Sequence, residues 1–544
     1  MPHASKGAIM NWLTIGEAVK VNAKKYPAKL AFKDEGRSLT FKQLDERTNR
    51  LANALLKLGL RKSDKLSVVM QNCVEFAEIY LAGAKAGIVV APVNWRYTPQ
   101  EAEYVIKNSD AKALITCPEC DHLVNEVRSR LKISPKRFIH TGPEESPGYA
   151  NYEKLIGGAS ATEPPVKVKG KDAWVILHTS GTTGTPKGVV RSHESYSAFF
   201  LINEVDFSFR PDDYGLIMMP LFHVNSTFYS FVFTYIGAGV YIHRERKFDP
   251  AEVLRIIEKE RITFSSMIPT HYALILGLSE EERKKYDVSS VRALLTSSAP
   301  VRRDMKLAIM DYFRGARLFE AYGSTEAGMV TLLRPEDQLS KLESIGKECA
   351  GTGPIKILDG KGREVEVGEI GELYSAGPMM FDCYYKLPEK TKTSRRGEYF
   401  SAGDMARKDA DGFYYLVDRK DNMIITGGEH VYPSEVEKVI GAHPAVREVA
   451  VVGLPHEKWG EAVTAVVVLK QNVSTTKDEI VDYCKDKISA FKKPKDVLFV
   501  DDSVIPRTTT GKIVHRHLKM RLLKELDGHG PARGPSASKR PKKT

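Results

Sequence analysis

The ten residues Thr179–Gly188, TSGTTGTPKG, follow an apolar run, AWVIL, at 173–177, with one histidine between them. Glycines in such a stretch let the backbone approach a ligand closely, and hydroxyl side chains and Lys187 offer contacts to an anion. A solvated turn can have the same composition. The stretch therefore indicates either a phosphate-binding loop after a strand or a solvated turn. The motifs in the rest of the chain distinguish these two interpretations.

A P-loop is the first form of phosphate loop to test. It requires the pattern GxxxxGK[ST]. Here Gly181 and Gly184 stand three residues apart, and Lys187 is preceded by a proline and followed by a glycine. The pattern fails, so a P-loop ATPase, which would release ADP and phosphate, stays only as an alternative.

Strands alternate with helices over the first 420 residues. The run TFKQL at 40–44 has capping-box spacing, and TPQE at 98–101 combines an N-cap, a proline and a capping-box acid. Short apolar runs such as KLSVVM (65–70) and VRALLTS (291–297) predict the strands between helices. This alternation predicts an α/β fold with parallel or mixed sheets that helices flank.

A change of pattern after residue 420 predicts a second domain. The order there is a helix, two strands, a helix over 476–488 (TKDEIVDYCKDKI), a strand, the loop IPRTTTGK (505–512) and a basic helix, which is typical of a small α+β unit. We therefore expect a large domain over 1–420, a small domain over 421–528 and a disordered basic tail over 529–544.

Charge and composition narrow the function classes. The net charge is +12, but the tail contributes five Lys or Arg and no acid, which leaves +7 for the remainder. The tail lacks aromatic residues on which bases could stack, so we expect no nucleic-acid partner; a binding protein that uses this tail stays an alternative. Six cysteines in 544 residues fit a reducing, cytoplasmic environment rather than a disulfide framework. The lone CPEC pair, Cys117 and Cys120, is interpreted as two unrelated thiols.

Two segments bear on membrane targeting. The N-terminal residues contain no long apolar stretch typical of a secretory signal. The stretch 214–242 carries no Asp, Glu, Lys or Arg, but it contains polar side chains that would be costly in lipid. We predict a buried helix beside a binding pocket there, and no integral membrane span.

Six further motifs occur in a fixed order along the chain. They are PLFHV (220–224), SSAP (297–300), EAYGSTEAG (320–328), YFSAGD (399–404), DRKDNMIITGGEHVYPSEVE (418–437) and PRTTTGK (506–512). Together with TSGTTGTPKG they resemble the signatures of the adenylate-forming superfamily, which comprises acyl-CoA synthetases, peptide-synthetase adenylation domains and luciferases. The resemblance extends to about residue 528. Within the superfamily, the sequence is most similar to carboxylic acid–CoA ligases.

The resemblance implies a role for each motif in using ATP, Mg²⁺ and a carboxylic acid. Lys512 would bridge the acyl carboxylate and the α-phosphate, Glu326 would ligate Mg²⁺, and Thr325 would contact the α-phosphate. His223 would lie at the passage between the acyl and thiol sites. The further nucleotide contacts that it implies are Thr179, Ser180, Gly181, Thr182, Thr183, Gly184, Lys187, Ser298, Ala299, Pro300, Glu320, Ala321, Tyr322, Gly323, Ser324, Asp404 and Arg419.

The resemblance also implies a second half-reaction, in which CoA attacks the acyl-adenylate. The small domain would rotate about Asp421, and Gly427, Gly428 and Glu429 would then line the tunnel for CoA. The expected acyl pocket is mostly apolar, and its residues are Val224, Asn225, Thr227, Phe228, Ala327, Gly328 and Met329. Such a pocket favours a monocarboxylic acid with a fatty, alicyclic or aromatic body.

The predicted function is thus an AMP-forming carboxylic acid–CoA ligase, acting as a monomer or homodimer. The alternatives on the same fold are a luciferase-like oxidation and the acylation of a carrier protein. One departure from the superfamily's pattern is the segment Ser297–Pro300, which is commonly richer in glycine.

Overall fold

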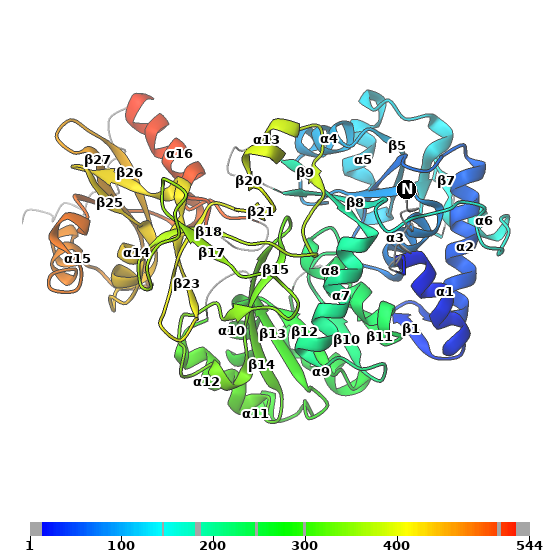
Figure 1. Cartoon of the computed structure of the whole chain (residues 1–544), viewed down its shortest axis with the longest axis horizontal. Coiled ribbons are helices and arrows are strands. Elements are labelled where there is room, and N and C mark those ends of the chain that lie inside the picture. The colour runs from blue at the N-terminus through cyan, green and yellow to red at the C-terminus, as the bar shows by residue number, and fades with distance from the viewer. Residues whose placement is uncertain are drawn as a thin grey trace, which may run out of the picture. The chain divides into compact units, whose positions relative to one another are not determined.

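The computed structural model describes residues 13–143, 146–179, 186–244, 248–297, 301–508 and 513–528. Several predicted site residues lie outside these ranges, namely Ser180, Gly181, Thr182, Thr183, Gly184, Ser298, Ala299, Pro300 and Lys512. The basic tail 529–544 also lies outside them. The α/β class is confirmed, with a large part built on sheets and a smaller α+β part (Figure 1).

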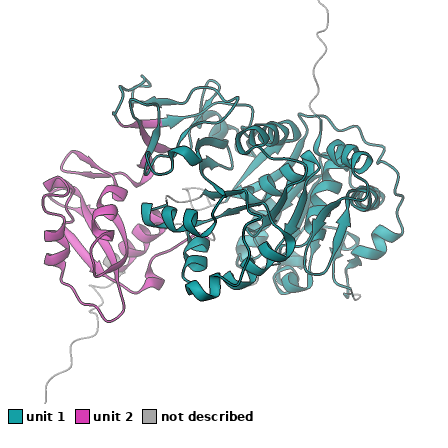
Figure 2. Cartoon of the chain, turned by 90° about the horizontal axis from the view of Figure 1, so that it is seen from below, with its two compact units in different colours: residues 1–369, 373–402, 408–415 teal, residues 370–372, 403–407, 416–544 magenta. Residues whose placement is uncertain are grey.

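The chain divides into two compact units (Figure 2). The larger comprises 1–369, 373–402 and 408–415, and the smaller comprises 370–372, 403–407 and 416–544. The predicted boundary at 420/421 therefore lies a few residues after the last change of unit, and two short segments before it belong to the smaller unit. Residues 370–372 and 403–407 could not be assigned to the smaller unit from the sequence, because the unit of a short strand depends on the strands with which it pairs.

An eight-stranded sheet forms the first layer of the larger unit, in the order β19-β9-β8-β4-β3-β5-β6-β7. Its strands are β3 (Lys65–Val69), β4 (Val89–Pro92), β5 (Ala111–Thr116), β6 (Phe138–His140), β7 (Ala150–Asn151), β8 (Ala173–Thr179), β9 (Lys187–Ser192) and β19 (Cys383–Tyr384). The pairs from β8 to β7 are parallel, whereas β8–β9 and β9–β19 are antiparallel.

A nine-stranded sheet forms the second layer, in the order β16-β15-β14-β13-β12-β10-β11-β1-β2. Its strands are β1 (Leu30–Lys33), β2 (Ser38–Thr40), β10 (Tyr214–Ile217), β11 (Gly239–Ile242), β12 (Phe264–Met267), β13 (Ala293–Ser297), β14 (Arg317–Ser324), β15 (Gly328–Leu333) and β16 (Lys347–Glu348). The central strands are parallel, and the β14–β15 hairpin makes one end antiparallel. The sheet is thus mixed, as predicted.

Helices connect these strands and cover the sheets. They are α1 (Ile15–Lys25), α2 (Phe41–Lys57), α3 (Val74–Ala86), α4 (Pro99–Asn108), α5 (Asp121–Val127), α6 (Tyr152–Gly157), α7 (His193–Phe207), α8 (Val224–Ile236), α9 (Pro250–Glu260), α10 (Pro269–Leu276), α11 (Glu280–Arg283), α12 (Arg303–Tyr312) and α13 (Pro388–Thr393). Thr40 and Thr98 form the predicted capping boxes of α2 and α4. Both boxes satisfy backbone N–H groups that the first helical turn leaves without a partner.

The uncharged stretch 214–242 folds as β10, α8 and β11. Helix α8 is buried along most of its length, and its Phe231 packs edge-on against Tyr80 and Trp174. The predicted buried helix is therefore confirmed. Within the described ranges, no helix is long and apolar enough to cross a membrane.

The segments around the change of unit form a four-stranded sheet, in the order β17-β18-β22-β23. Its strands are β17 (Lys356–Leu358), β18 (Gly371–Tyr374), β22 (Asp404–Lys408) and β23 (Tyr414–Arg419). The short strands β20 (Arg395–Arg396) and β21 (Tyr399–Phe400) pair with each other.

The smaller unit has its own sheet and core. Its strands are β24 (Ile424–Thr426), β25 (Glu429–Val431), β26 (Val446–His456), β27 (Gly460–Leu469) and β28 (Asp496–Phe499), and its helices are α14 (Pro433–Gly441), α15 (Lys477–Tyr483) and α16 (His515–Gly528). Strand β28 adds to β27 in parallel, and β26 pairs with β27 along its whole length. Helix α15 ends five residues earlier than the predicted helix 476–488, because Asp486 has a left-handed backbone, φ 60°.

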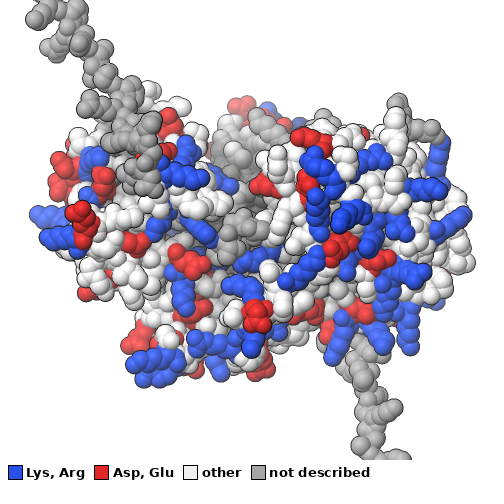
Figure 3. Space-filling model, turned by 90° about the horizontal axis from the view of Figure 1, so that it is seen from above, with Lys and Arg blue, Asp and Glu red and all other residues white. Residues whose placement is uncertain are grey.

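On the face of the molecule drawn in Figure 3, basic side chains are spread widely and acidic side chains lie between them. An electrostatic footprint for nucleic acid would instead gather one sign of charge. This face therefore gives no support to the alternative of a nucleic-acid-binding protein.

Candidate active site

The proposed magnesium ligand Glu326 lies in the turn of the β14–β15 hairpin. The register pairs Ser324 with Gly328 across the turn, and Ser324 Oγ accepts a hydrogen bond from the Ala327 N–H at 3.0 Å. A side chain at Gly323 would put its Cβ 2.1 Å from the Gly328 carbonyl oxygen, and Gly328 has φ 76°. The two glycines of EAYGSTEAG are thus required by the hairpin itself.

The described ends of the predicted phosphate loop lie on two strands of the eight-stranded sheet. Thr179 is the last residue of β8, Lys187 is the first of β9, and the register pairs the two. The loop between them is therefore a hairpin connection, with Lys187 at its exit. The described ends of the predicted loop, Thr179 and Lys187–Gly188, belong to the two strands, and residues 180–185 lie outside the described ranges.

A segment that the sequence did not single out, 379–385, connects these two hairpins. Its Tyr384 hydroxyl donates to Glu326 Oε1 at 2.7 Å, and the Phe381 N–H donates to the Glu326 carbonyl at 2.7 Å. Strand β19 pairs with β9 next to the phosphate loop, and Lys187 Nζ lies 5.7 Å from the centre of the Tyr384 ring. The lysine and the glutamate therefore belong to one site, with Tyr384 in contact with both.

Arg191 is a second residue that the sequence analysis missed. It is fully buried on β9 and donates to the carbonyl oxygens of Thr325, at 2.7 Å, and Met379. Burial lowers the pKa of its guanidinium, against the attraction of acidic groups including Glu326. Its guanidinium carbon lies 5.0 Å from the ring centre of Phe228, a predicted acyl-pocket residue. The sequence offers one indication of a buried role for Arg191, because this charged residue directly follows the apolar residues of GVVRS (188–192).

The nucleotide residues predicted before Thr325 lie on β14, where Ala321, Tyr322 and Ser324 are partly exposed and Gly323 is exposed. Glu320 is buried and forms an ion pair with the fully buried Lys306 at 2.7 Å. Burial raises the pKa of Glu320, while Lys306 and the Val301 N–H oppose the shift. The ion pair thus connects strand β14 with helix α12. Lys306 is a third residue without a role in the sequence analysis.

His223 is the N-cap of α8, and its Nδ1 accepts a hydrogen bond from the Asn225 N–H at 3.3 Å. Burial lowers the pKa of His223 to about 4, so the ring is neutral at pH 7. The structure therefore assigns His223 a helix-capping contact, and its place at the passage between the acyl and thiol sites stays a prediction.

The predicted acyl-pocket residues divide by exposure. Thr227, Phe228, Ala327, Gly328 and Met329 are buried, and Phe228 stacks on Phe199 with ring centres 3.7 Å apart. Val224 and Asn225 are partly exposed, and Asn225 donates to Ser266 Oγ at 2.9 Å. The structure therefore makes Val224 and Asn225 the members that a ligand reaches without displacing core side chains.

In the smaller unit, two of the predicted nucleotide contacts, Asp404 and Arg419, form an ion pair. Arg419 Nε lies 2.6 Å from Asp404 Oδ1, and Asp404 is buried at 6% exposure. A carboxylate has two acceptor oxygens, which suits it to the two hydroxyls of a ribose. The structure thus brings these residues together from β22 and β23.

Asp421 and the tunnel residues are exposed. Asp421 lies in a single turn of 3₁₀ helix, Lys420–Asn422, between β23 and β24. Gly427 and Gly428 have φ values of 60° and 87° and form the two-residue turn of the β24–β25 hairpin, where Thr426 pairs with Glu429. Positive φ at both positions is what a type I′ turn requires. The turn, rather than close packing inside the chain, accounts for the glycine at 428, since a Cβ there would meet nothing within 4 Å.

The described residues fit a magnesium ion at Glu326. Its carboxylate is a hard oxygen ligand of the kind that Mg²⁺ prefers, and Tyr384 engages only Oε1. Each carboxylate has two acceptor oxygens, so Oε2 retains capacity for a cation. When bound, the ion would supply charge neutralisation for the phosphates of ATP.

Comparison with known proteins identifies the family of this chain. The chain matches the family model "AMP-binding enzyme" over residues 19–385 and that of the "AMP-binding enzyme C-terminal domain" over 435–512. It therefore belongs to the AMP-binding enzyme family and is an adenylate-forming enzyme of the acyl-CoA synthetase type.

Three relatives illustrate the range of the family. The chain is 33% identical to the long-chain-fatty-acid–CoA ligase FadD13 of Mycobacterium tuberculosis, over 88% of this chain and 92% of that protein. It is 31% identical to a feruloyl-CoA synthase of Amycolatopsis sp, over 92% and 97%. The structure of the Bacillus subtilis o-succinylbenzoate CoA synthetase MenE with ATP and magnesium has a TM-score of 0.81 at 26% identity, covering 92% of this chain and 99% of that one.

Proposed function

We propose that this protein is an AMP-forming carboxylic acid–CoA ligase that acts on a monocarboxylic acid with a hydrophobic body. In a first step the acid attacks the α-phosphorus of ATP, which gives acyl-AMP and pyrophosphate. In a second step the thiol of CoA attacks the acyl-AMP, which gives acyl-CoA and AMP. The observation that carries the proposal is the contact of Tyr384 with both Lys187 and Glu326, because it joins two predicted phosphate-site residues in one place.

For the first step we assign a role to each of the predicted nucleotide-site residues. Lys187 binds phosphate oxygens, and Thr325 contacts the α-phosphate. Asp404, paired with Arg419, accepts the ribose hydroxyls. Lys512 reduces the repulsion between the attacking carboxylate and the α-phosphate, both of which are anionic. Glu326 holds the magnesium ion that accompanies ATP.

For the second step we assign the exposed hairpin turn of the smaller unit, Gly427 to Glu429, to the CoA tunnel, with Asp421 as the hinge. Exposed backbone in a tight turn is suited to contact a narrow thiol arm, since Gly427 and Gly428 carry no side chains. The absence of a charged side chain among the predicted acyl-pocket residues favours an acid without a second carboxylate. Relatives named for fatty acids and for ferulate support both chain-like and aromatic bodies.

Product identity tests this proposal directly. The protein is incubated with ATP, Mg²⁺ and a panel of fatty and aromatic monocarboxylic acids, with and without CoA, and the nucleotide products are separated. We expect AMP and pyrophosphate, and acyl-CoA only when CoA is present. Formation of ADP would contradict the phosphate-loop assignment. AMP without acyl-CoA would instead point to a carrier protein or oxygen as the acceptor, and oxygen uptake or light would identify the latter.

A further inference from the structure

The Tyr384 hydroxyl has a direct bond to the proposed magnesium ligand. It donates to Glu326 Oε1 at 2.7 Å, and the tyrosine is 5% exposed. Hydrogen bonds to a carboxylate are among the stronger ones in proteins, and one to a single oxygen restricts the rotation of the carboxylate. A buried phenol in this position therefore selects which oxygen of Glu326 is turned away from it.

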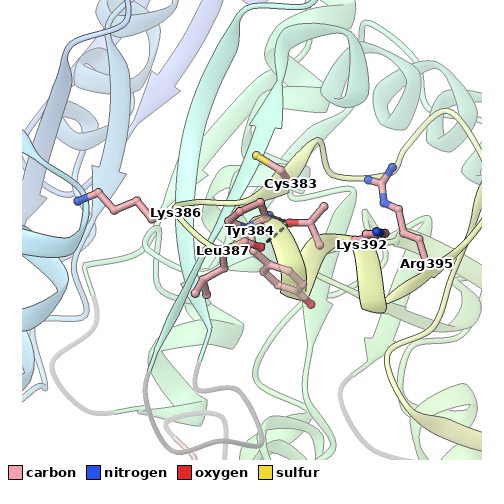
Figure 4. Close-up of a pocket in the computed structure, with 8 residues that line it drawn as sticks. Cys383, Tyr384, Lys386, Leu387, Lys392 and Arg395 are labelled. Atoms are coloured by element: carbon pink, nitrogen blue, oxygen red, sulfur yellow. Dashed lines mark hydrogen bonds between the residues drawn. The ribbon is translucent and has the colours of Figure 1, made fainter.

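Tyr384 is itself held in place by contacts along its backbone. Its N–H donates to Thr391 Oγ1 at 2.9 Å, and that hydroxyl donates to the Leu387 carbonyl at 3.0 Å (Figure 4). The strand pairing sets Tyr384 opposite Val189, and the N–H of the next residue donates to the Gly188 carbonyl at 2.7 Å. The backbone of Tyr384 is thus anchored in a paired strand, which limits where its side-chain hydroxyl can lie.

The main chain on both sides of Glu326 is fixed as well. The Phe381 N–H bonds the Glu326 carbonyl, and Arg191 bonds the carbonyl of Thr325. With backbone and carboxylate both held, Glu326 is set in one orientation before any nucleotide arrives. Residues that orient a metal ligand in this way typically change metal affinity when they are removed.

The face of the same ring contacts the phosphate lysine. Lys187 Nζ lies 5.7 Å from the ring centre, within the range of a cation–π contact. The ring thus contacts an ammonium on its face and a carboxylate at its hydroxyl. A phenylalanine would preserve the first contact and remove the second, which makes the two separable by experiment.

We propose that Tyr384 is a positioning residue for adenylation, which orients Glu326 so that the protein binds ATP in its magnesium complex. The proposal rests on the proposed function, in which Glu326 ligates the magnesium ion. It predicts that the hydroxyl matters for the contribution of Mg²⁺ to nucleotide binding, and not for the binding of the nucleotide without the metal.

The test measures binding of α,β-methylene-ATP by calorimetry, once with excess Mg²⁺ and once with EDTA, for the wild type and for Tyr384→Phe. The ratio of the two dissociation constants is the magnesium stimulation. We expect it to fall about tenfold in Tyr384→Phe, the low end of the loss typical of a residue that orients a metal ligand. We expect the dissociation constant in EDTA to stay the same.

The matched control is Tyr385→Phe, because the neighbouring hydroxyl donates to Asp110 at 2.9 Å and does not contact Glu326. We expect it to keep the wild-type stimulation. Thr391→Val, which loosens the backbone of Tyr384, should lower the stimulation less than Tyr384→Phe does. A wild-type stimulation in folded Tyr384→Phe would overturn the role of Tyr384. Lack of nucleotide binding by the wild type would instead overturn the proposed function.

Discussion

Two hairpin turns carry proposed site residues, and they are built in opposite ways. The turn of β14–β15, with Glu326, is braced by bonds from Phe381, Tyr384 and Arg191, all distant in sequence. The turn of β24–β25, with Gly427 and Gly428, is exposed and is shaped by its own backbone conformation. The turn with Glu326, in the larger unit, is thus held in place by the surrounding structure before a ligand binds. The turn with Gly427 and Gly428, in the smaller unit, depends only on its own backbone conformation.

The largest effect should come from breaking the buried ion pair behind the braced turn. Lys306→Met leaves the Glu320 carboxylate without its partner in the core, and we expect a loss of roughly 3–5 kcal/mol in the free energy of unfolding. Urea denaturation at pH 7 measures it. The double variant Lys306→Met/Glu320→Leu should regain most of the loss, and a double variant as unstable as the single one would contradict this account.

Replacing Lys512 should instead separate the two reactions without a cost in stability. We expect Lys512→Ala to slow adenylate formation by about 10²–10³-fold, since it removes positive charge from the reacting anions. Thioester formation from supplied acyl-AMP should continue at the wild-type rate. The two half-reactions are measured separately by pyrophosphate exchange and by acyl-CoA release. An equal loss in both would contradict the role of Lys512.

Buried histidines should make the larger unit sensitive to acid. Burial lowers the pKa of His193 to about 3, whereas the unfolded chain protonates it near its ordinary value of 6.5. The neutral form is therefore favoured by folding; its contribution is fully present above pH 6.5 and is lost as the pH falls towards 3. Between these two pH values, one such group lowers the free energy of unfolding by about 1.4 kcal/mol for each pH unit.

Denaturation by urea at pH 7 and at pH 5.5 measures this slope. His178, His223 and His271, whose pKa values are each lowered to about 4, act in the same direction. His193→Gln should reduce the pH dependence of the free energy of unfolding by the contribution of about one proton. A variant with the full wild-type slope would show that His193 does not contribute.

The smallest effect should come from the exposed turn. Gly428→Ala places a side chain at φ 87°, and we expect a cost of about 1–2 kcal/mol confined to the smaller unit. Thioester formation should slow while pyrophosphate exchange stays at the wild-type rate. Gly412→Ala, at a turn where the glycine is half-buried and has φ 85°, is a matched control for the backbone strain. Equal slowing of thioester formation in both variants would contradict the tunnel assignment.

Local patterns predicted much of the fold. The capping boxes at Thr40 and Thr98, the strands and the buried helix α8 all follow from residues near one another in sequence. Helix α15 was predicted too long, because the left-handed backbone at Asp486 has no clear signal in KDKI. Of the candidate site, the motif residues came from the ordered signatures, and their roles stay predictions.

The sequence by itself determined the family, the order of the motifs and the glycines that the two hairpin turns require, because each depends on neighbouring residues. Only the tertiary structure decided which side chains hold the proposed site in place. Tyr384, Arg191 and Lys306 reach Glu326, Thr325 and Glu320 across sheet pairings and helix packing. Such contacts are set by the register of strands and the burial of charge, which no local pattern encodes.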